Sequence, residues 1–319
     1  MSTIRTAAIF GAAGAIGMHL GRELDRRGIP FRAVGRRKAR LEETFGALPR
    51  AEIRDADAAD IASATAALRG ADTVFYTLGL PYPQHRLHPV LMRNTLQAAE
   101  AAGVARLVLV SSVYPFGVPR TAKVAETHPR VPCSRKGEYR KQQEDLVLDA
   151  HAKGSIAASI LRLPDFYGPG ADLSLAHLIF QAAVQGKTAT WLGPAGTPHE
   201  FVYVPDTAPV LADLAEAEDC YGQAWHFGGP GPISGIDFIT RVYRAAGRAP
   251  KYRTVGPGLM KILGWFKADY AEVPEMMYLQ ETPVLLDDSK LLARFPETRK
   301  TSYDEGIRAT LEKTGGPRV

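Results

Sequence analysis

The stretch Gly11-Ala12-Ala13-Gly14-Ala15-Ile16-Gly17 directly follows the apolar run Ala7–Phe10. A strand that ends at Gly11 must turn sharply into a helix, and glycine tolerates the backbone angles of such a turn. Gly14 lacks a Cβ and lets a pyrophosphate approach the backbone, while Gly17 lets the helix pack closely on the sheet. Free N–H groups and the positive end of the helix dipole then face the anion. The stretch therefore predicts a turn that cradles a phosphate group.

Short apolar runs alternate with helix-type segments through the first half of the chain. Further strands are expected at Phe31–Gly35, Ala51–Arg54, Thr73–Leu78, Leu107–Ser111 and Ile156–Leu161, and helices up to Leu24 and at Ile61–Leu68, Val90–Ala102 and Glu138–Lys153. Such alternation is typical of an α/β fold with a doubly wound parallel sheet, the Rossmann fold.

The pattern changes after Leu163, where Pro and Gly become frequent. We expect a dinucleotide-binding Rossmann domain over residues 1–163 and a smaller C-terminal substrate-binding lobe over residues 164–200 and 229–319. Residues 201–228 are expected to return to the first domain, with Phe201–Val204 as a strand that rejoins the sheet.

The composition is that of an ordinary globular protein, with 45% hydrophobic and 23% charged residues in a chain of 319. Basic residues are spread along the chain apart from one cluster at 36–40, so the net charge of +5 does not indicate nucleic-acid binding. No apolar run reaches about 18 residues, so no membrane span is expected. Cys133 and Cys220 form no disulfide framework and no metal-binding pattern, which favours a cytoplasmic protein without a metal site.

Several motifs, spread over nearly the whole chain, resemble those of the extended short-chain dehydrogenase/reductases, the superfamily that includes NAD-dependent epimerases and dehydratases. Together they are far more specific than the three glycines alone. They are the glycine turn, Ala56-Asp57-Ala58-Ala59-Asp60, Gly70-Ala71-Asp72, Val110-Ser111-Ser112, residues 161–169 and residues 200–206. The resemblance implies an NAD(P) cofactor and a homodimer formed through the helices Val90–Ala102 and Glu138–Lys153.

In this family an aspartate at the position of Asp57 binds the adenine amino group. The second strand ends in Arg36, whose guanidinium suits the 2′-phosphate of NADP(H), whereas an NAD site needs an acid there. NADP(H) is therefore preferred, and NAD remains the alternative if Arg36 belongs only to a basic surface turn. Asn94 is equally consistent with a supporting role and with a plain polar helix position. Further cofactor contacts are expected from Ala13, Ala15, Ile16, Ala58, Leu78, Gly79, Pro164 and Phe166.

The resemblance also implies a catalytic serine at the end of the fifth strand. Ser112 fits this role because it precedes Gly117 by the spacing of the family pattern, although Phe116 replaces the usual tyrosine. A serine that merely caps a loop is the alternative.

The usual Tyr-x-x-x-Lys pair is missing, and two alignments remain open. In the first, Tyr139 is the acid/base and Gln143 replaces the lysine. In the second, which we favour, Lys136 takes the tyrosine position and Arg140 the lysine position, and Tyr139 still lines the pocket. Both pairs have the i, i+4 spacing that places two side chains on one helix face, so periodicity does not choose between them.

Candidate substrate contacts are Tyr82, Tyr167, Trp191 and Tyr203, each equally consistent with a loop or core position. Their aromatic character favours reduction of a carbonyl in a small, mostly apolar or aromatic molecule by an NADP(H)-dependent oxidoreductase. One alternative is a nucleotide-sugar epimerase or dehydratase that retains NAD, but residues 172–203 contain only Lys187 as a positive charge for a diphosphate. A non-catalytic NADP(H)-binding sensor is the other alternative, because the catalytic set is altered.

Overall fold

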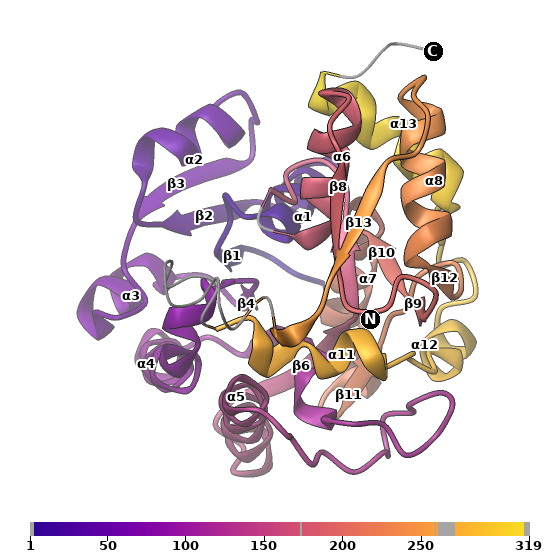
Figure 1. Ribbon diagram of the computed structural model, residues 1–319. Coiled ribbons are helices and arrows are strands. Elements are labelled where there is room, and N and C mark those ends of the chain that lie inside the picture. The colour runs from indigo at the N-terminus through magenta and orange to yellow at the C-terminus, as the bar shows by residue number, and fades with distance from the viewer. Residues whose placement is uncertain (1–2, 173, 259, 261–271, 316–319) are drawn as a thin grey trace. The chain divides into compact units, whose positions relative to one another are not determined.

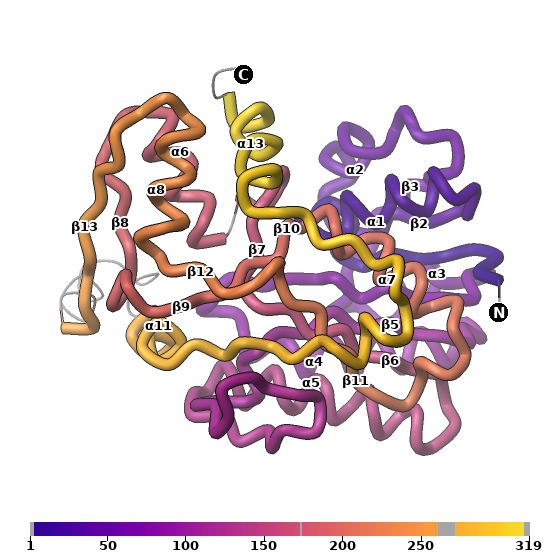
Figure 2. The backbone as a smooth tube through the Cα atoms, turned by 90° about the vertical axis from the view of Figure 1, so that its right-hand side faces the viewer, coloured from indigo at the N-terminus to yellow at the C-terminus, as the bar shows by residue number. Residues whose placement is uncertain are grey.

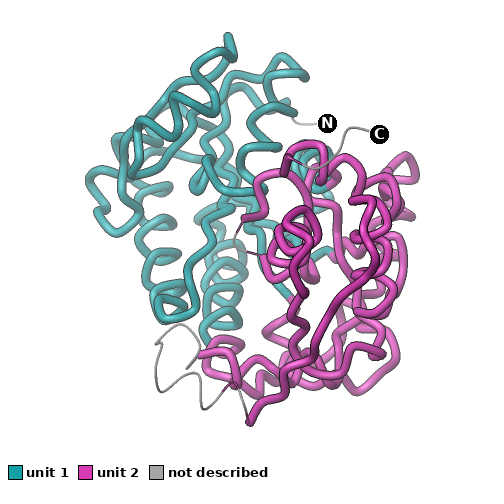
Figure 3. Tube along the Cα trace, turned by 45° about the horizontal axis from the view of Figure 1, so that its top comes forward, with its two compact units in different colours: residues 1–112, 139–162, 207–225 teal, residues 113–138, 163–206, 226–319 magenta. Residues whose placement is uncertain are grey.

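The computed structural model (Figure 1) describes residues 3–172, 174–258, 260 and 272–315. The chain divides into two compact units, shown in teal and magenta in Figure 3. Unit 1 comprises residues 1–112, 139–162 and 207–225, and unit 2 comprises residues 113–138, 163–206 and 226–319.

The first unit is built on a seven-stranded sheet with the order β11-β6-β5-β4-β1-β2-β3 (Figure 1). The pairings that join β3, β2, β1, β4 and β5 are parallel. This is the strand order of a Rossmann sheet, so the predicted fold class is confirmed. The strands are β1 (Ala7–Phe10), β2 (Phe31–Gly35), β3 (Ala51–Asp55), β4 (Thr73–Tyr76), β5 (Arg106–Ser112), β6 (Ala157–Leu163) and β11 (Ala224–His226).

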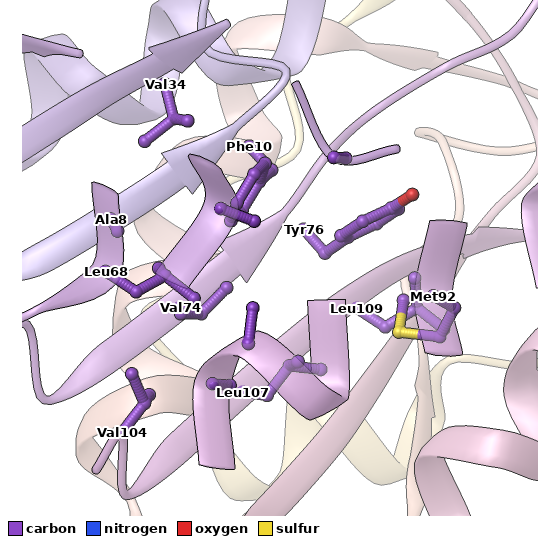
Figure 4. Packing of buried hydrophobic residues seen from close by; sticks show 14 of the residues in the cluster. Ala8, Phe10, Val34, Leu68, Val74, Tyr76, Met92, Val104, Leu107 and Leu109 are labelled. Atoms are coloured by element: carbon purple, nitrogen blue, oxygen red, sulfur yellow. The ribbon is translucent and has the colours of Figure 1, made fainter. Parts of the chain in front are cut away.

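Helices alternate with the strands as the sequence predicts, although the helix at Lys38–Phe45 was not expected from the sequence. They are α1 (Ala15–Arg26), α2 (Lys38–Phe45), α3 (Ile61–Leu68), α4 (His88–Ala102), α5 (Arg135–Ala152) and α7 (Thr207–Glu216), with short 3-10 helices η1 (Tyr82–Leu87) and η4 (Glu218–Cys220). Strands β1 and β4 are buried along their whole length. Figure 4 shows the core, in which Phe10, Val74 and Leu107 converge from three neighbouring strands. Parallel strands covered on both faces need such continuous apolar runs.

Within its described residues, unit 2 combines three two-stranded sheets with several helices (Figure 2). Residues from part of these sheets and helices form an aromatic core. The strand pairs are β7 (Asp165–Tyr167) with β10 (Phe201–Tyr203), β8 (Ala189–Leu192) with β13 (Tyr252–Val255), and β9 (Pro198–His199) with β12 (Ile233–Ser234). The described helices are η2 (Tyr114–Phe116), α6 (Leu175–Val184), η3 (Val204–Asp206), α8 (Gly235–Ala245), η5 (Pro274–Met276), α11 (Tyr278–Glu281), α12 (Ser289–Arg294) and α13 (Tyr303–Thr314).

The expected return of Phe201–Val204 to the main sheet is not found. Strand β10 pairs with β7 instead, and the Phe201 ring stacks on Phe238 at 4.7 Å between ring centroids within the core of unit 2. Residues 207–225 do lie in unit 1, whereas residues 113–138, which the sequence placed in the first domain, lie in unit 2. None of the described helices combines the length and apolar character that crossing a bilayer requires.

Candidate functional site

The turn after β1 depends on glycine at two positions. Gly11 has a φ of +80°, and a Cβ built on it would lie 2.7 Å from the Cα of Leu78. A Cβ on Gly17 would lie 2.4 Å from the carbonyl oxygen of Gly11. Both contacts are with main-chain atoms, which cannot rotate away, so these two residues let the turn, α1 and the end of β4 come together.

Gly14 differs, since a Cβ there would meet only the Gly11 carbonyl oxygen, at 3.1 Å. Gly14 is exposed and is the N-cap of α1, which has no side-chain cap and no acidic residue in its first turn. The N–H groups of that turn are therefore available to an anionic ligand. Ala13 and Ala15 are half-buried beside it, whereas Ile16 turns its side chain into the core.

Thr77, which the sequence analysis missed, ties the end of β4 to this turn. Its hydroxyl donates to the carbonyl oxygen of Phe10 at 2.9 Å, and its N–H donates to the same oxygen at 2.9 Å. Nothing lies within 4 Å of a Cβ built on Gly79, two residues later, so there is open space beside this loop. A polar residue directly after an apolar strand was the available signal.

The structure brings together the two predicted adenosine contacts, Arg36 and Asp57. The guanidinium lies 3.9 Å from the carboxylate, and the two side chains are 72% and 42% exposed. A pair this exposed contributes little stability, which leaves the guanidinium accessible to a ligand. Asn94 donates to the carbonyl oxygen of Ala59 at 3.0 Å and, more weakly, to that of Ala58 at 3.4 Å, so it supports the loop that carries Asp57.

A buried ion pair connects α5 to the sheet near the end of β5. Ser112, the last residue of β5, is half-buried. Arg162 on β6 donates to Glu144 through Nη2 at 2.7 Å and Nε at 3.0 Å, and the two side chains are 2% and 0% exposed. The hydroxyl of Ser111 donates to the same carboxylate at 2.6 Å. Neither partner of this ion pair was singled out from the sequence.

Arg140 lies in the interior of unit 1. Its guanidinium donates to the Val110 carbonyl at 2.9 Å and to the Gln143 side-chain oxygen at 2.6 Å, and lies 3.3 Å from Nδ1 of His88. Burial, the charge of Arg140 and the neighbouring His85 lower the pKa of His88 far below its usual range, so the ring is neutral and accepts at Nδ1. Arg140 and Gln143, one from each proposed alignment, thus bind each other and fix α5 against α4 and β5.

Lys136, at the start of α5, is 2% exposed and belongs to unit 2. Its ammonium donates to Glu272 at 2.6 Å and to Glu275 at 2.7 Å. Tyr139, on the part of α5 that belongs to unit 1, is half-buried. Neither glutamate is evident from the sequence, because both lie far from Lys136 along the chain.

Two of the four candidate substrate contacts are core residues. Tyr167 is fully buried, with its ring 5.4 Å from that of Phe238, and Trp191 is 6% exposed and packs edge-on against His199 at 5.1 Å. Their large apolar surfaces complete the core of unit 2 rather than face a ligand. Tyr203 and Tyr82 are half-buried, as is Phe166, while Pro164 is buried. No group of three or more His, Cys, Asp or Glu residues placed to hold a metal ion occurs within the part of the chain that the structure describes.

Residues 11–147 match the model of a family described as NAD(P)H-binding. A 2'-dehydrokanamycin reductase of Streptomyces kanamyceticus is 31% identical over 163 residues, which are 48% of this chain and only 44% of the reductase. A 3 beta-hydroxysteroid dehydrogenase/Delta 5→4-isomerase of Mycobacterium tuberculosis is 26% identical over 279 residues, which are 81% of this chain and 74% of that protein.

Solved structures with the same fold cover almost the whole chain. UDP-glucuronic acid 4-epimerase from Bacillus cereus, in complex with UDP-glucuronic acid and NAD, aligns with a TM-score of 0.82 and 18% identity over 97% of this chain and 99% of that one. A dTDP-glucose 4,6-dehydratase from Streptomyces venezuelae with bound NAD aligns with a TM-score of 0.81 and 20% identity over 97% of each chain. Residues 11–147 thus match an NAD(P)H-binding family model, and the chain shares its fold with an NAD-bound epimerase and an NAD-bound dehydratase, as the motifs predict.

Proposed function

We propose that this protein is an NADP(H)-dependent reductase that acts on the carbonyl group of a small, mostly apolar or aromatic molecule. The observation that carries the proposal is the exposed guanidinium of Arg36 at the carboxyl end of β2, beside Asp57 and on the same sheet edge as an uncapped glycine turn. A guanidinium there suits a 2′-phosphate. The names of the two curated relatives, a reductase and a hydroxysteroid dehydrogenase, support carbonyl or hydroxyl chemistry.

The residues present fit a dinucleotide. The first turn of α1 would hold its pyrophosphate, Asp57 its adenine and Arg36 its 2′-phosphate. When bound, the cofactor supplies a hydride to the carbonyl carbon. The chain itself must hold the carbonyl oxygen and donate a proton to it. We assign the hydrogen bond to the oxygen to Ser112, and the proton to Lys136, with Tyr139 as the alternative donor.

The cofactor assignment is tested by titrating NADPH and NADH into the wild type, Arg36→Ser and Arg40→Ser. Arg40 belongs to the same basic cluster but pairs with Glu43 at 3.3 Å, so it is the matched control for charge. Losing a charge-assisted hydrogen bond should weaken NADPH binding by about 10- to 100-fold in Arg36→Ser. NADH binding should be unchanged in both variants. An equal loss for the two cofactors in Arg36→Ser would overturn the NADP(H) assignment.

The reaction is tested by following NADPH absorbance with a panel of aldehydes and ketones. Consumption that is lost in Ser112→Ala and Lys136→Ala would support the reductase. Retained activity in Lys136→Ala together with loss in Tyr139→Phe would move the proton donor to Tyr139. Tight NADPH binding with no turnover would favour a sensor, and copurified NAD that does not exchange would favour an epimerase or dehydratase, the class to which the structural neighbours belong.

A further inference from the structure

The ammonium group of Lys136 is buried, yet it contacts two carboxylates rather than one. Nζ donates to Oε2 of Glu272 at 2.6 Å and to Oε2 of Glu275 at 2.7 Å. All three residues belong to unit 2, and both glutamates lie in one short segment that includes η5. One carboxylate suffices to neutralise a buried ammonium, so we ask what each of the two carboxylates contributes.

Glu275 has the role of a positioning residue. Its other carboxylate oxygen accepts the backbone N–H of Lys136 at 3.2 Å, so the same side chain caps the start of α5 and holds the lysine side chain. Burial raises the pKa of Glu275, but hydrogen bonds from the Lys136 ammonium and from backbone N–H groups outweigh it and hold the pKa below its usual value. Glu275 therefore remains ionised and is a poor proton carrier.

Glu272 is more exposed to water than Glu275. Its side chain is 41% exposed, compared with 27% for Glu275 and 2% for Lys136. The carboxylate thus touches the buried ammonium on one side and water on the other. A group in this position can accept a proton from water and pass it on over a single hydrogen bond.

We propose that Glu272 is the residue through which the buried amine of Lys136 exchanges protons with solvent, and that Glu275 holds that amine in place. This proposal extends the proposed reductase function and rests on it only for the protonation of the substrate oxygen. In that step an N–H bond of Lys136 would break and an O–H bond would form on the substrate oxygen, while bound NADPH would supply the hydride to the carbonyl carbon. The neutral amine then regains a proton from water through Glu272, so each turnover consumes one proton and one NADPH.

The proton path is tested without cofactor or substrate, by measuring NMR exchange of the Lys136 ammonium protons with water in the full-length protein. Lys136→Arg identifies the signal, because it removes that signal alone. Glu281→Gln is the matched control, since Glu281 is an exposed glutamate of the following helix, α11. We expect exchange to slow by about tenfold or more in Glu272→Gln, in which the amide can bond the amine but cannot carry a proton. Exchange in Glu281→Gln should match that of the wild type.

Unchanged or faster exchange in Glu272→Gln would overturn the proposal, because a residue that only covers the ammonium would expose it to water when altered. Where the wild type reduces a carbonyl, Glu272→Ala should lower kcat without changing KM, and added formate should restore kcat by replacing the missing carboxylate. A kcat equal to that of the wild type would also overturn the proposal. If exchange is slowed in Glu272→Gln but the wild type reduces no carbonyl, the proton path is supported and the proposed reductase function is contradicted.

Discussion

Residue by residue, the three glycines of the turn after β1 are required for different reasons. Gly11 and Gly17 are required by the fold, because a side chain at either would collide with the main chain. Gly14 is exposed, and the absence of a side chain there would let a pyrophosphate approach the backbone. The same motif therefore contains two residues that the fold requires and one that we expect to serve cofactor binding.

Substitutions should separate these reasons. Gly14→Ala should fold with a thermal midpoint close to that of the wild type but bind NADPH about tenfold more weakly or worse, because its methyl group occupies the path of the pyrophosphate. Gly17→Ala should lose stability as well, since the collision with the Gly11 carbonyl forces α1 away from the turn. Thermal unfolding and calorimetric titration measure the two effects. Wild-type NADPH affinity in Gly14→Ala would contradict this interpretation of the turn.

Glu200 predicts a pH-dependent stability. It is 9% exposed and accepts the N–H of Leu286 at 3.1 Å. Burial, which outweighs this hydrogen bond, raises the pKa of Glu200 from 4.5 to about 7. The folded state therefore keeps the proton at a pH where the unfolded chain has lost it, and stability falls as pH rises from 4.5 to about 7.

The shift corresponds to roughly 3 kcal/mol between the two ends of that range. Glu200→Gln should keep the bond from Leu286 and be more stable than the wild type at high pH, with a flatter pH profile. Urea unfolding followed through tryptophan fluorescence at acid and alkaline pH measures the difference. Parallel profiles for the two proteins would mean that Glu200 ionises normally.

Among the elements, α5 is held by polar contacts along its buried face. Arg140 binds the carbonyl oxygen of Val110 on β5, and Glu144 binds Arg162 on β6 and Ser111 on β5. These buried groups have specific partners, so they specify one placement of the helix where an apolar face would tolerate several. Helix placement in turn determines where Tyr139 lies.

Removing one partner of the Glu144 and Arg162 pair should therefore lower the free energy of unfolding more than replacing both partners with apolar residues. Glu144→Gln leaves the guanidinium of Arg162 buried without a full counter-charge and should lower the free energy of unfolding by about 3–5 kcal/mol. The double variant Glu144→Met with Arg162→Met should recover much of that loss. Urea unfolding of the single and double variants measures the coupling, and strictly additive effects would show that the two side chains act independently.

For the whole molecule, the expected homodimer remains a prediction. Helices α4 and α5 are the proposed contact surfaces, and Val90 near the start of α4 offers an apolar side chain that is 43% exposed. Light scattering at micromolar concentration should give twice the chain mass of 34.6 kDa.

Val90→Arg should shift the protein toward the monomer, because a charge would enter an apolar contact. Val118→Arg is the matched control, as Val118 is 49% exposed and belongs to neither helix. A monomeric wild type, or equal effects of the two substitutions, would contradict the proposed interface.

Local sequence patterns determined the Rossmann fold, the residue range of α3 and the glycine turn. The periodicity of strands and helices and the backbone angles of glycine depend on residues that are close together in the chain. The positions at which parallel strands end follow from the strand order. Only the tertiary structure decided that β10 pairs with β7, that Tyr167 and Trp191 pack the core, and that Lys136 meets two glutamates 136 and 139 residues away. Such contacts form when segments that are distant in the chain bury their apolar and charged groups against each other. Local spacing in the sequence does not identify these partners.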